Sequence, residues 1–427
     1  MKKIMVLLLV TIFLLVGCSS SDSKNDSNKG KEDDPITVWA WDPNYNLAAL
    51  NIAKDYYKKV DADLDVTIIE NGKDDIVQKL NTALSSGITK GLPNIALIED
   101  YQAQSFLQSF PDAFYPLTDV FNVSDFAEYK IAPTSFNGQN YGLPFDTGVT
   151  GLYVRTDYLE EAGYTIDDMK GIDWSEYIEI GKKVKEVTGK DFITIDPNDL
   201  RIIQIMIQSA GSWYLKDDGV TPDLAGNEKM KEAFELYKAM LDANIVKINS
   251  DWGQFIGIIN SGDTVTVPTG NWITPSIKAE ESQSGKWAIV PLPTLTVAGA
   301  TNASNVGGSS WYVLDIPGAE KAADFLGKTF GSDAEFYQQL VTEIGAIGTY
   351  KPASEGDAYE IEDEFFQGQK IYADFAEWME QVPGVNYGLH TYAIDDIITV
   401  EMQNYMNGKD IDDVLNDAQK QAESQLK

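Results

Sequence analysis

The stretch from Thr37 to Leu50 constrains the fold most, because its pattern is that of a strand running directly into a helix. The segment TVWAWD is rich in β-branched and aromatic residues, a Pro-Asn turn follows, and apolar residues then recur at helical spacing. In open α/β sheets, ligands gather outside the carboxyl ends of the strands. We therefore expect Trp41 and Asp42 on the wall of a crevice, where an indole face beside a carboxylate suits a pyranose ring. The alternative is that Trp41 packs in the core or at its rim.

A second strand-to-helix unit repeats this order further along the chain. Residues 94–98 form a buried type of strand that ends in Asp100 and Tyr101, and a helix is predicted over residues 104–110. This places another acid and aromatic ring at the carboxyl end of a strand, and both are candidates for the ligand site. The alternative is that Asp100 only caps the helix. The alternation of strands and helices predicts an α/β fold.

The amino terminus has the features of an export signal that ends at a lipidated cysteine. Lys2 and Lys3 precede an apolar run that is shorter than the ~20 residues of a bilayer span, and the sequence LVGC resembles the bacterial lipobox. The resemblance implies cleavage after residue 17 and acylation of Cys18, which would anchor the protein to the cell membrane. An ordinary secretory signal is the alternative. Cys18 is the only cysteine, so the chain has no intrachain disulfide.

Charge and composition exclude several classes of partner. Residues 19–34 contain no hydrophobic residue and are predicted to be a disordered tether. The full chain has 66 acidic and 33 basic residues, a net charge of -33, which argues against nucleic acid and against direct binding to anionic lipid. Arg155 and Arg201 are the only arginines, so an anionic ligand is not expected.

The sequence offers little for metal or enzyme chemistry. His390 is the only histidine, which excludes a His-His metal ligand pair, and no G-x-S-x-G motif is present. We expect no cofactor, no metal and no catalytic residue. A glycoside hydrolase with paired carboxylates remains the chief alternative, because 66 acidic residues make some acid pair inevitable.

A family resemblance is carried by several motifs in a fixed order. YGLPFDTGVTGLYVRTDYLEEAGY, the upstream VWAWDPN, the lipobox, GNWITPSI and NVGGSSW together resemble the family 1 extracellular solute-binding proteins. These are the sugar-binding lipoproteins of bacterial ABC importers, the family that includes maltose-binding protein. The resemblance extends from about residue 36 to the carboxyl terminus.

The resemblance implies a two-lobed, periplasmic-binding-protein-like fold of type II, with three crossovers and a ligand cleft between the lobes. The crossovers are expected near Asp146, Gly308 and Gly345, where small residues tolerate changes of φ and ψ. The predicted domains are a signal peptide at 1–17, a lipidated tether at 18–34, lobe 1 at 35–146 plus 308–345, and lobe 2 at 147–307 plus 346–427.

Further ligand-binding candidates lie at the crossovers and in the second lobe. Asp146, Gly308 and Ser309 belong to the crossovers; at Gly308 the backbone could approach a ligand hydroxyl, although such glycines more often serve the turn alone. Trp213 follows an apolar helix predicted over residues 200–210; it either faces the cleft or packs under a loop. Asn271 and Trp272 pair an amide with an apolar plate after a short strand.

The function implied by the resemblance is a receptor, not an enzyme. It would be a lipid-anchored, extracytoplasmic monomer that captures a neutral mono- or oligosaccharide and delivers it to ABC importer permease subunits. The anchor, palmitate in such lipoproteins, would hold it to the membrane. A peptide or amino-acid receptor is a third hypothesis; with only two arginines to hold a carboxylate, the sequence favours it less.

Overall fold

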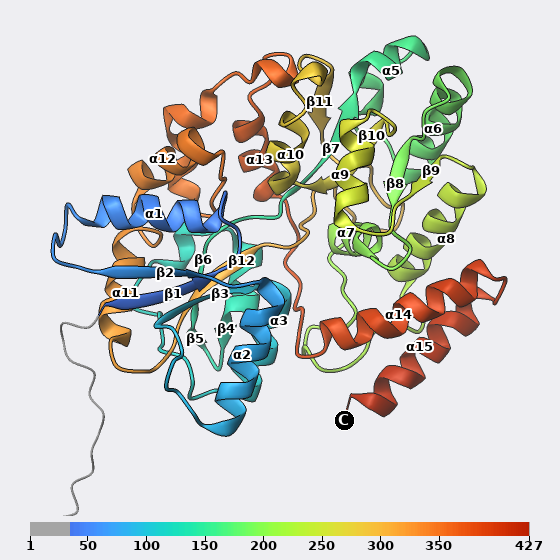
Figure 1. Cartoon of the computed structure of the whole chain (residues 1–427). Coiled ribbons are helices and arrows are strands. Elements are labelled where there is room, and N and C mark those ends of the chain that lie inside the picture. Colours follow the sequence, from blue (N-terminus) through green and yellow to red (C-terminus); the bar gives the residue numbers. More distant parts are fainter. Residues whose placement is uncertain (1–34, 427) are drawn as a thin grey trace, which may run out of the picture.

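The computed structural model describes residues 35–426 and contains two α/β lobes (Figure 1). The predicted signal peptide, the tether and the lipidation of Cys18 lie outside the described residues. Blue and orange elements form one lobe, and green and yellow elements form the other. None of the described helices combines the length and the apolar character that a bilayer span requires.

The first lobe is built on a five-stranded sheet with the order β2-β1-β3-β12-β6. The strands are β1 (Ile36–Ala40), β2 (Val66–Glu70), β3 (Ile95–Glu99), β6 (Gly142–Pro144) and β12 (Ser309–Val313). β1 pairs in parallel with β2 and β3, whereas β12 is antiparallel to both β3 and β6. Because β12 lies more than 160 residues after β6, the chain leaves this lobe and returns to it.

Helices cover this sheet and connect its strands. They are α1 (Asn46–Tyr57), α2 (Lys73–Ser86), α3 (Asp100–Ser109), α11 (Ala319–Lys328) and α12 (Ala334–Ile344), with the short α4 (Ile131–Thr134) and the hairpin β4 (Ser135–Phe136) and β5 (Gln139–Asn140) beside α3. β1 and α1 confirm the predicted strand-to-helix unit at the start of the domain. α3 starts directly at the end of β3, four residues earlier than predicted.

The second lobe contains a three-stranded antiparallel sheet and a parallel strand pair. The first has the order β10-β7-β11, with β7 (Thr150–Arg155), β10 (Thr266–Gly270) and β11 (Trp287–Val290); the second joins β8 (Ile193–Ile195) to β9 (Val246–Ile248). The surrounding helices are α5 (Thr156–Glu161), α6 (Trp174–Thr188), α7 (Arg201–Ser209), α8 (Glu228–Asp242), α9 (Trp252–Asn260), α10 (Thr274–Lys278), α13 (Ile371–Met379), α14 (Thr391–Met406) and α15 (Ile411–Gln425).

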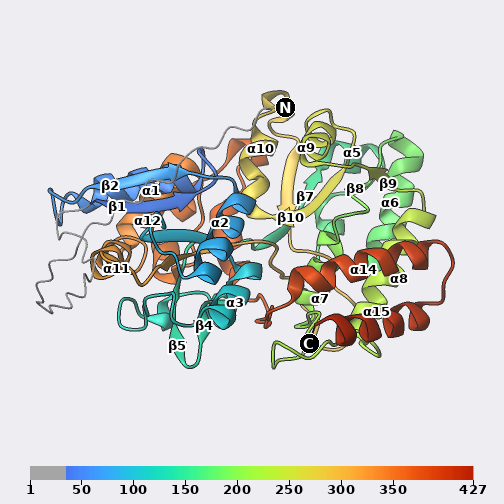
Figure 2. The ribbon, with the colours of Figure 1, turned by 60° about the horizontal axis from the view of Figure 1, so that its bottom comes forward.

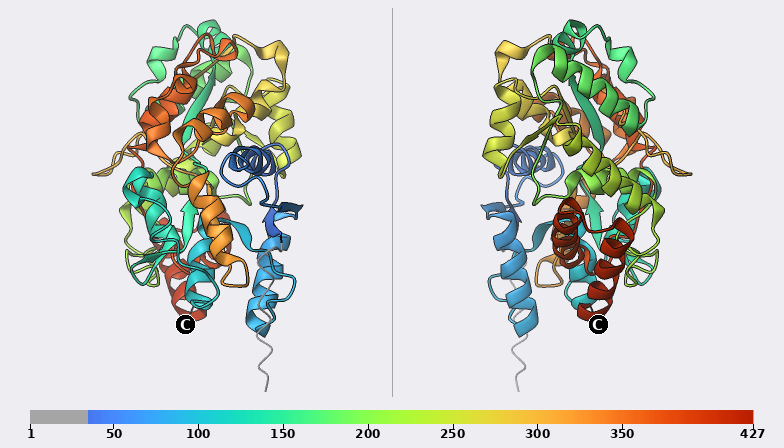
Figure 3. Two further views of the ribbon diagram at one scale, coloured as in Figure 1. Left: turned by 90° about the vertical axis from the view of Figure 1, so that its left-hand side faces the viewer. Right: turned by 90° about the vertical axis from the view of Figure 1, so that its right-hand side faces the viewer.

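Local sequence signals account for several of these helices. Asp173 followed three residues later by Glu176 is the sequence pattern that predicts a capping box, and the two residues form one at the start of α6: the Asp173 side chain accepts from the Glu176 N–H, and Glu176 accepts from the Asp173 N–H. α7 is buried along nearly its whole length, as its apolar sequence predicts. α14 and α15 lie side by side on the outside of the second lobe, which the views in Figures 2 and 3 both show.

Three segments that run between the two lobes meet at one place. Residues 145–149 link β6 to β7, and residues 291–308 link β11 to β12. Val149 forms a β-bridge with Asn305, and Asp146 forms one with Gly348, which follows α12. The three predicted crossover points are therefore neighbours in space. The exact lobe boundaries given above stay a prediction.

Candidate functional site

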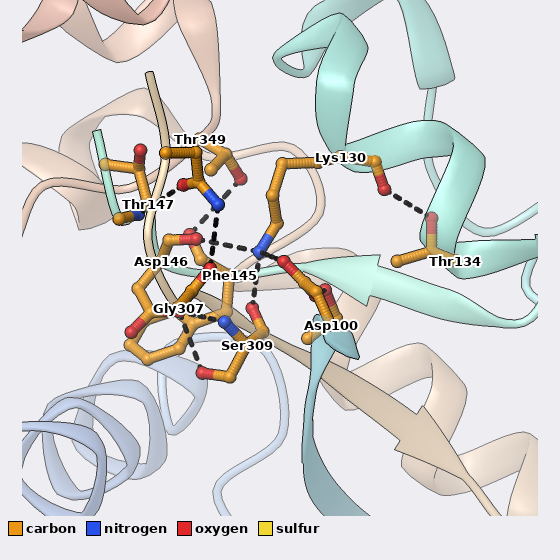
Figure 4. Close-up of polar contacts among 12 residues, drawn as sticks. Asp100, Lys130, Thr134, Phe145, Asp146, Thr147, Gly307, Ser309 and Thr349 are labelled. Atoms are coloured by element: carbon orange, nitrogen blue, oxygen red, sulfur yellow. Dashed lines mark hydrogen bonds and ion pairs between the residues drawn. The ribbon is translucent and has the colours of Figure 1, made fainter. Parts of the chain in front are cut away.

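A buried lysine ties the crossover segments together. The Nζ atom of Lys130 donates to Asp100 Oδ2 at 2.5 Å, to the Asp146 carbonyl oxygen at 2.9 Å and to the Ser309 carbonyl oxygen at 3.0 Å (Figure 4). An ammonium group has three N–H donors, so this arrangement satisfies all of them. We call Asp100, Lys130, Asp146 and Ser309 the crossover cluster. A fully buried lysine requires such partners, because an unpaired charge in the interior is costly.

The carboxylate of Asp100 is turned into this cluster. Its side chain is 1% exposed, and its second oxygen accepts from the Ser310 hydroxyl at 2.9 Å. Asp100 makes no capping hydrogen bond, so the alternative that it caps α3 is wrong. Both oxygens are engaged inside the protein, and we assign Asp100 a structural role.

Asp146 keeps more freedom than Asp100. Its Oδ1 atom accepts from the backbone N–H and the hydroxyl of Ser309, at 2.5 and 2.8 Å, while its Oδ2 atom has no hydrogen-bond partner among the described residues. Burial raises the pKa of Asp146 to about 6, against the opposing charge of Lys130. The side chain is half-buried, so Asp146 stays a candidate for ligand contact.

Packing explains the glycine at position 308. Gly308 has a φ of +93°, and a Cβ atom there would lie 3.1 Å from Asp100 Oδ2 and 3.2 Å from Lys130 Nζ. Only glycine fits this position without displacing the ion pair. Ser309 is buried and its hydroxyl is taken by Asp146, so neither residue presents a free side-chain group to a ligand.

A cluster of aromatic side chains joins the two lobes. The Tyr101 ring, on α3, lies 5.3 Å from the Trp213 ring and 4.6 Å from the Tyr387 ring, and its hydroxyl accepts from the Gly307 N–H at 3.2 Å. Trp213 is buried, and its indole N–H donates to the Thr391 hydroxyl at 2.9 Å. The structure thus places Trp213 in packing between segments, which was the alternative to an open sugar platform. Tyr101 and Trp213 are brought together, but as an interlobe contact.

Asn271 and Trp272 follow β10, as predicted. Asn271 is buried; its backbone N–H donates to the Val149 carbonyl, and its Oδ1 atom has no hydrogen-bond partner among the described residues. Trp272 is half-buried, with its indole N–H donating to the Val306 carbonyl at 3.0 Å. This bond fixes the ring and leaves its faces for contact with other groups.

A pocket of about 210 Å³ lies in the second lobe, beside Trp272. Its lining includes the polar and aromatic residues Thr194, Asp196, Asp199, Arg201, Asn249, Asp251, Trp252, Phe255 and Thr269. The Trp252 ring is 5.8 Å from the Trp272 ring, and the Arg201 guanidinium carbon is 5.5 Å from the centre of that same ring. We call this the lobe-2 pocket. It combines the Trp252 indole with acceptors and one strong donor group, and the Trp272 indole lies beside it.

Most of this pocket lies outside the candidates named from the sequence. The pattern of residues 252–259 predicts a helix near the cleft, but none of its residues is among those candidates, although Trp252 is 51% exposed. An apolar helix, WGQFIGIIN, of which only Ile259 is fully buried, was an available signal for a binding surface. Arg201, one of two arginines in the chain, was another.

Trp41 and Asp42 stand at the carboxyl end of β1. Their backbone N–H groups donate to the Asn46 side-chain oxygen at 3.1 and 3.0 Å, and Asp42 Oδ1 accepts from the Asn44 N–H at 2.8 Å. Trp41 is half-buried against the core, which matches the rim position given as the alternative, but part of the ring stays exposed. Figures 1 and 2 both show this end of α1 pointing toward α10 of the second lobe. Contact of either residue with a ligand stays a prediction.

No group of three or more metal-ligating side chains occurs among residues 35–426. The site is thus a set of aromatic rings, carboxylates, an amide and a guanidinium, which suits hydrogen bonding and stacking with an uncharged polar ligand.

Comparison with known proteins places this geometry in a family. The model that describes bacterial extracellular solute-binding proteins matches residues 51–367. The chain belongs to this family. Membership places the protein outside the cytoplasm, as predicted from the sequence.

Individual members of the family are similar over nearly the whole chain. The lactose-binding protein of Rhizobium radiobacter is 44% identical over 393 residues, which cover 92% of this chain and 93% of the relative. The sugar-binding protein MalE from Xanthomonas citri has the same fold, with a TM-score of 0.76, 16% identity, and coverage of 92% and 97%. The ABC-transporter-associated binding protein from B. animalis subsp. lactis Bl-04, solved with β-1,6-galactobiose, matches with a TM-score of 0.72 and 23% sequence identity. The match covers 92% of this chain and 98% of that protein. These structures confirm the two-lobed fold of type II.

Proposed function

We propose that this protein captures a neutral disaccharide of the lactose class between its lobes and delivers it to an ABC importer. The observation that carries the proposal is the lobe-2 pocket, in which Trp252 stands with acceptors and a guanidinium, next to the Trp272 ring. A pyranose has apolar C–H faces and a rim of hydroxyls, so it needs both kinds of contact. The 44% identity to a lactose-binding protein narrows the class of sugar.

Charge supports a neutral ligand. The pocket is lined by Asp196, Asp199 and Asp251 against the single cation Arg201, and the chain as a whole carries a net charge of -33. An anion would meet repulsion at long range and again inside the pocket. Hydroxyl groups, in contrast, donate well to ionised carboxylates.

A binding role fits the acids better than catalysis does. A glycosidase needs two carboxyl groups free to flank a glycosidic bond. In the crossover cluster, the Asp100 carboxylate accepts hydrogen bonds from Lys130 and Ser310, and the Asp146 Oδ1 atom accepts one from the Ser309 hydroxyl. We therefore propose that the protein has no hydrolase activity. A peptide receptor is also disfavoured, because the Arg201 guanidinium is already paired with Asp199.

The remaining parts of the proposal concern the cell surface. Acylation at Cys18 would anchor the chain to the membrane, and the tether at residues 19–34 would give the two lobes reach toward the permease. We propose that the protein acts as a monomer, with the sugar and the permease as its partners.

The test is a binding assay with a panel of neutral sugars. Isothermal titration of the mature protein with lactose, other galactose-containing disaccharides and arabinooligosaccharides should show one tight class, and chromatography after hours should recover the sugar intact. Asp42→Ala, at the lobe-1 side, should weaken binding at least tenfold. No binding to any sugar, or cleavage of the disaccharide, would refute the proposal.

A further inference from the structure

Arg201 is placed in the lobe-2 pocket together with a partner that cancels its charge. Its Nη2 atom donates to Asp199 Oδ2 at 2.7 Å, and its backbone N–H donates to Asp199 Oδ1 at 3.0 Å. Asp199 thus both neutralises the guanidinium and accepts from the first residue of α7. The pair borders the Trp272 ring, 5.5 Å from the guanidinium carbon.

Stability does not explain this pair. The side chains of Arg201 and Asp199 are 34% and 41% exposed, and ion pairs this accessible contribute little to folding. The other arginine, Arg155, differs: its side chain is 5% exposed, and it donates to Asp157 with both Nε and Nη2. Arg201 has no hydrogen-bond partner for Nε or Nη1 among the described residues, so these donors are available at the pocket.

We infer that Asp199 is a specificity-determining residue that makes Arg201 a donor for sugar hydroxyls and keeps sugar acids out of the pocket. The inference rests on the proposed function, because it takes the lobe-2 pocket as the sugar site. With Asp199 in place, three carboxylates face one guanidinium and the lining carries a net charge of -2. A carboxylate on the ligand would compete with Asp199 for the same fork and would be repelled by Asp196 and Asp251.

Removal of the Asp199 charge should let the pocket bind sugars that carry a carboxylate. In Asp199→Asn the amide oxygen can still accept from the Arg201 backbone N–H, so α7 keeps its start. The guanidinium fork then has no charged partner, and its geometry suits a ligand carboxylate through two parallel hydrogen bonds. The ammonium group of a lysine cannot form two parallel hydrogen bonds of this kind, so the expected gain in acid affinity depends on the guanidinium of Arg201.

The experiment compares neutral and acidic disaccharides of matched shape by isothermal titration. Lactitol and lactobionate share an open-chain terminal unit and differ by a carboxylate, and an aldobiouronic acid with its carboxylate on the non-reducing unit tests the other end. We expect Asp199→Asn to bind at least one acid at least tenfold more tightly than the wild type, so that the ratio of its acid affinity to its lactose affinity rises at least tenfold. The double variant Asp199→Asn/Arg201→Gln should lose the gain.

Two controls separate the possible outcomes. Asp242→Asn removes an equal charge from the surface pair with Lys238, and it should leave all affinities unchanged. This inference alone would be overturned if the wild type binds neutral sugar but Asp199→Asn binds no acid more tightly. It would also be overturned if Asp242→Asn shows the same gain in acid affinity, or if the double variant without Arg201 keeps that gain. A wild type that binds no sugar at all would overturn the proposed function and this inference with it.

Discussion

Lys130→Met should destabilise the protein severely, because it removes the cation that is paired with the buried carboxylate of Asp100. Lys130 is 0% and Asp100 1% exposed, so water cannot replace the lost contact. Breaking a buried ion pair by removing one partner costs about 3–5 kcal/mol. The carbonyl oxygens of Asp146 and Ser309 also lose a charged donor. We expect a loss of this size in urea unfolding followed by tryptophan fluorescence.

Two further variants decide whether the charge is the cause. Lys130→Met/Asp100→Asn removes both charges and should recover much of the stability lost in the single variant. Lys328→Met breaks an exposed pair with Asp324 on α11 and should cost less than about 1 kcal/mol. The reasoning is refuted if Lys130→Met costs no more than the Lys328 control, or if the double variant is as unstable as the single one.

Three other perturbations test the site and its pH dependence. Trp252→Ala and Trp272→Ala should each weaken disaccharide binding at least tenfold in titration calorimetry, about 1.4 kcal/mol, and unchanged affinity in both would exclude the lobe-2 pocket as the site. The pKa of Asp146 is raised from 3.8 to about 6 in the folded state. Its contribution to the unfolding free energy is therefore complete below pH 4 and falls as the pH rises to about 6. The part of the pH dependence of the unfolding free energy that Asp146 causes should vanish in Asp146→Asn. Tyr392→Phe removes a hydrogen bond from α14 to Glu99 across the lobes, so sugar should dissociate several-fold faster in stopped-flow fluorescence, and an unchanged rate would show that the bond does not hold the lobes together.

The sequence predicted those features whose causes lie within a few residues of each other. The Asp173–Glu176 capping box spans three residues, and the strand-to-helix turn at Trp41 and Asp42 depends on its own Pro-Asn pair. Each could be read from a short window, because hydrogen bonding and periodicity act locally. The order of the motifs then supplied the two-lobed topology.

The predicted site residues that the structure buries, Asp100 and Trp213, depend on partners far along the chain. Asp100 follows a strand as expected, but Lys130 enters from 30 residues later and buries it. Trp213 follows a helix-ending glycine, but its indole N–H meets Thr391, 178 residues away. These partners cannot be predicted from a short window of sequence, because the residues next to an acid in the chain do not show whether a distant residue buries it.

The two cations near the cleft serve different purposes, and their chemistry explains the difference. Lys130 holds acceptors from three separate segments, and a compact ammonium on a flexible stem keeps such contacts while the segments shift relative to one another. Lobe movement requires that kind of tolerance at the crossovers. Arg201 presents a rigid planar fork at the pocket surface, which suits selection among ligand groups and would not suit a moving joint. Of the acids predicted to bind sugar at the crossovers, Asp100 is therefore held by the lysine, and the ligand selection that we propose belongs to the lobe-2 pocket.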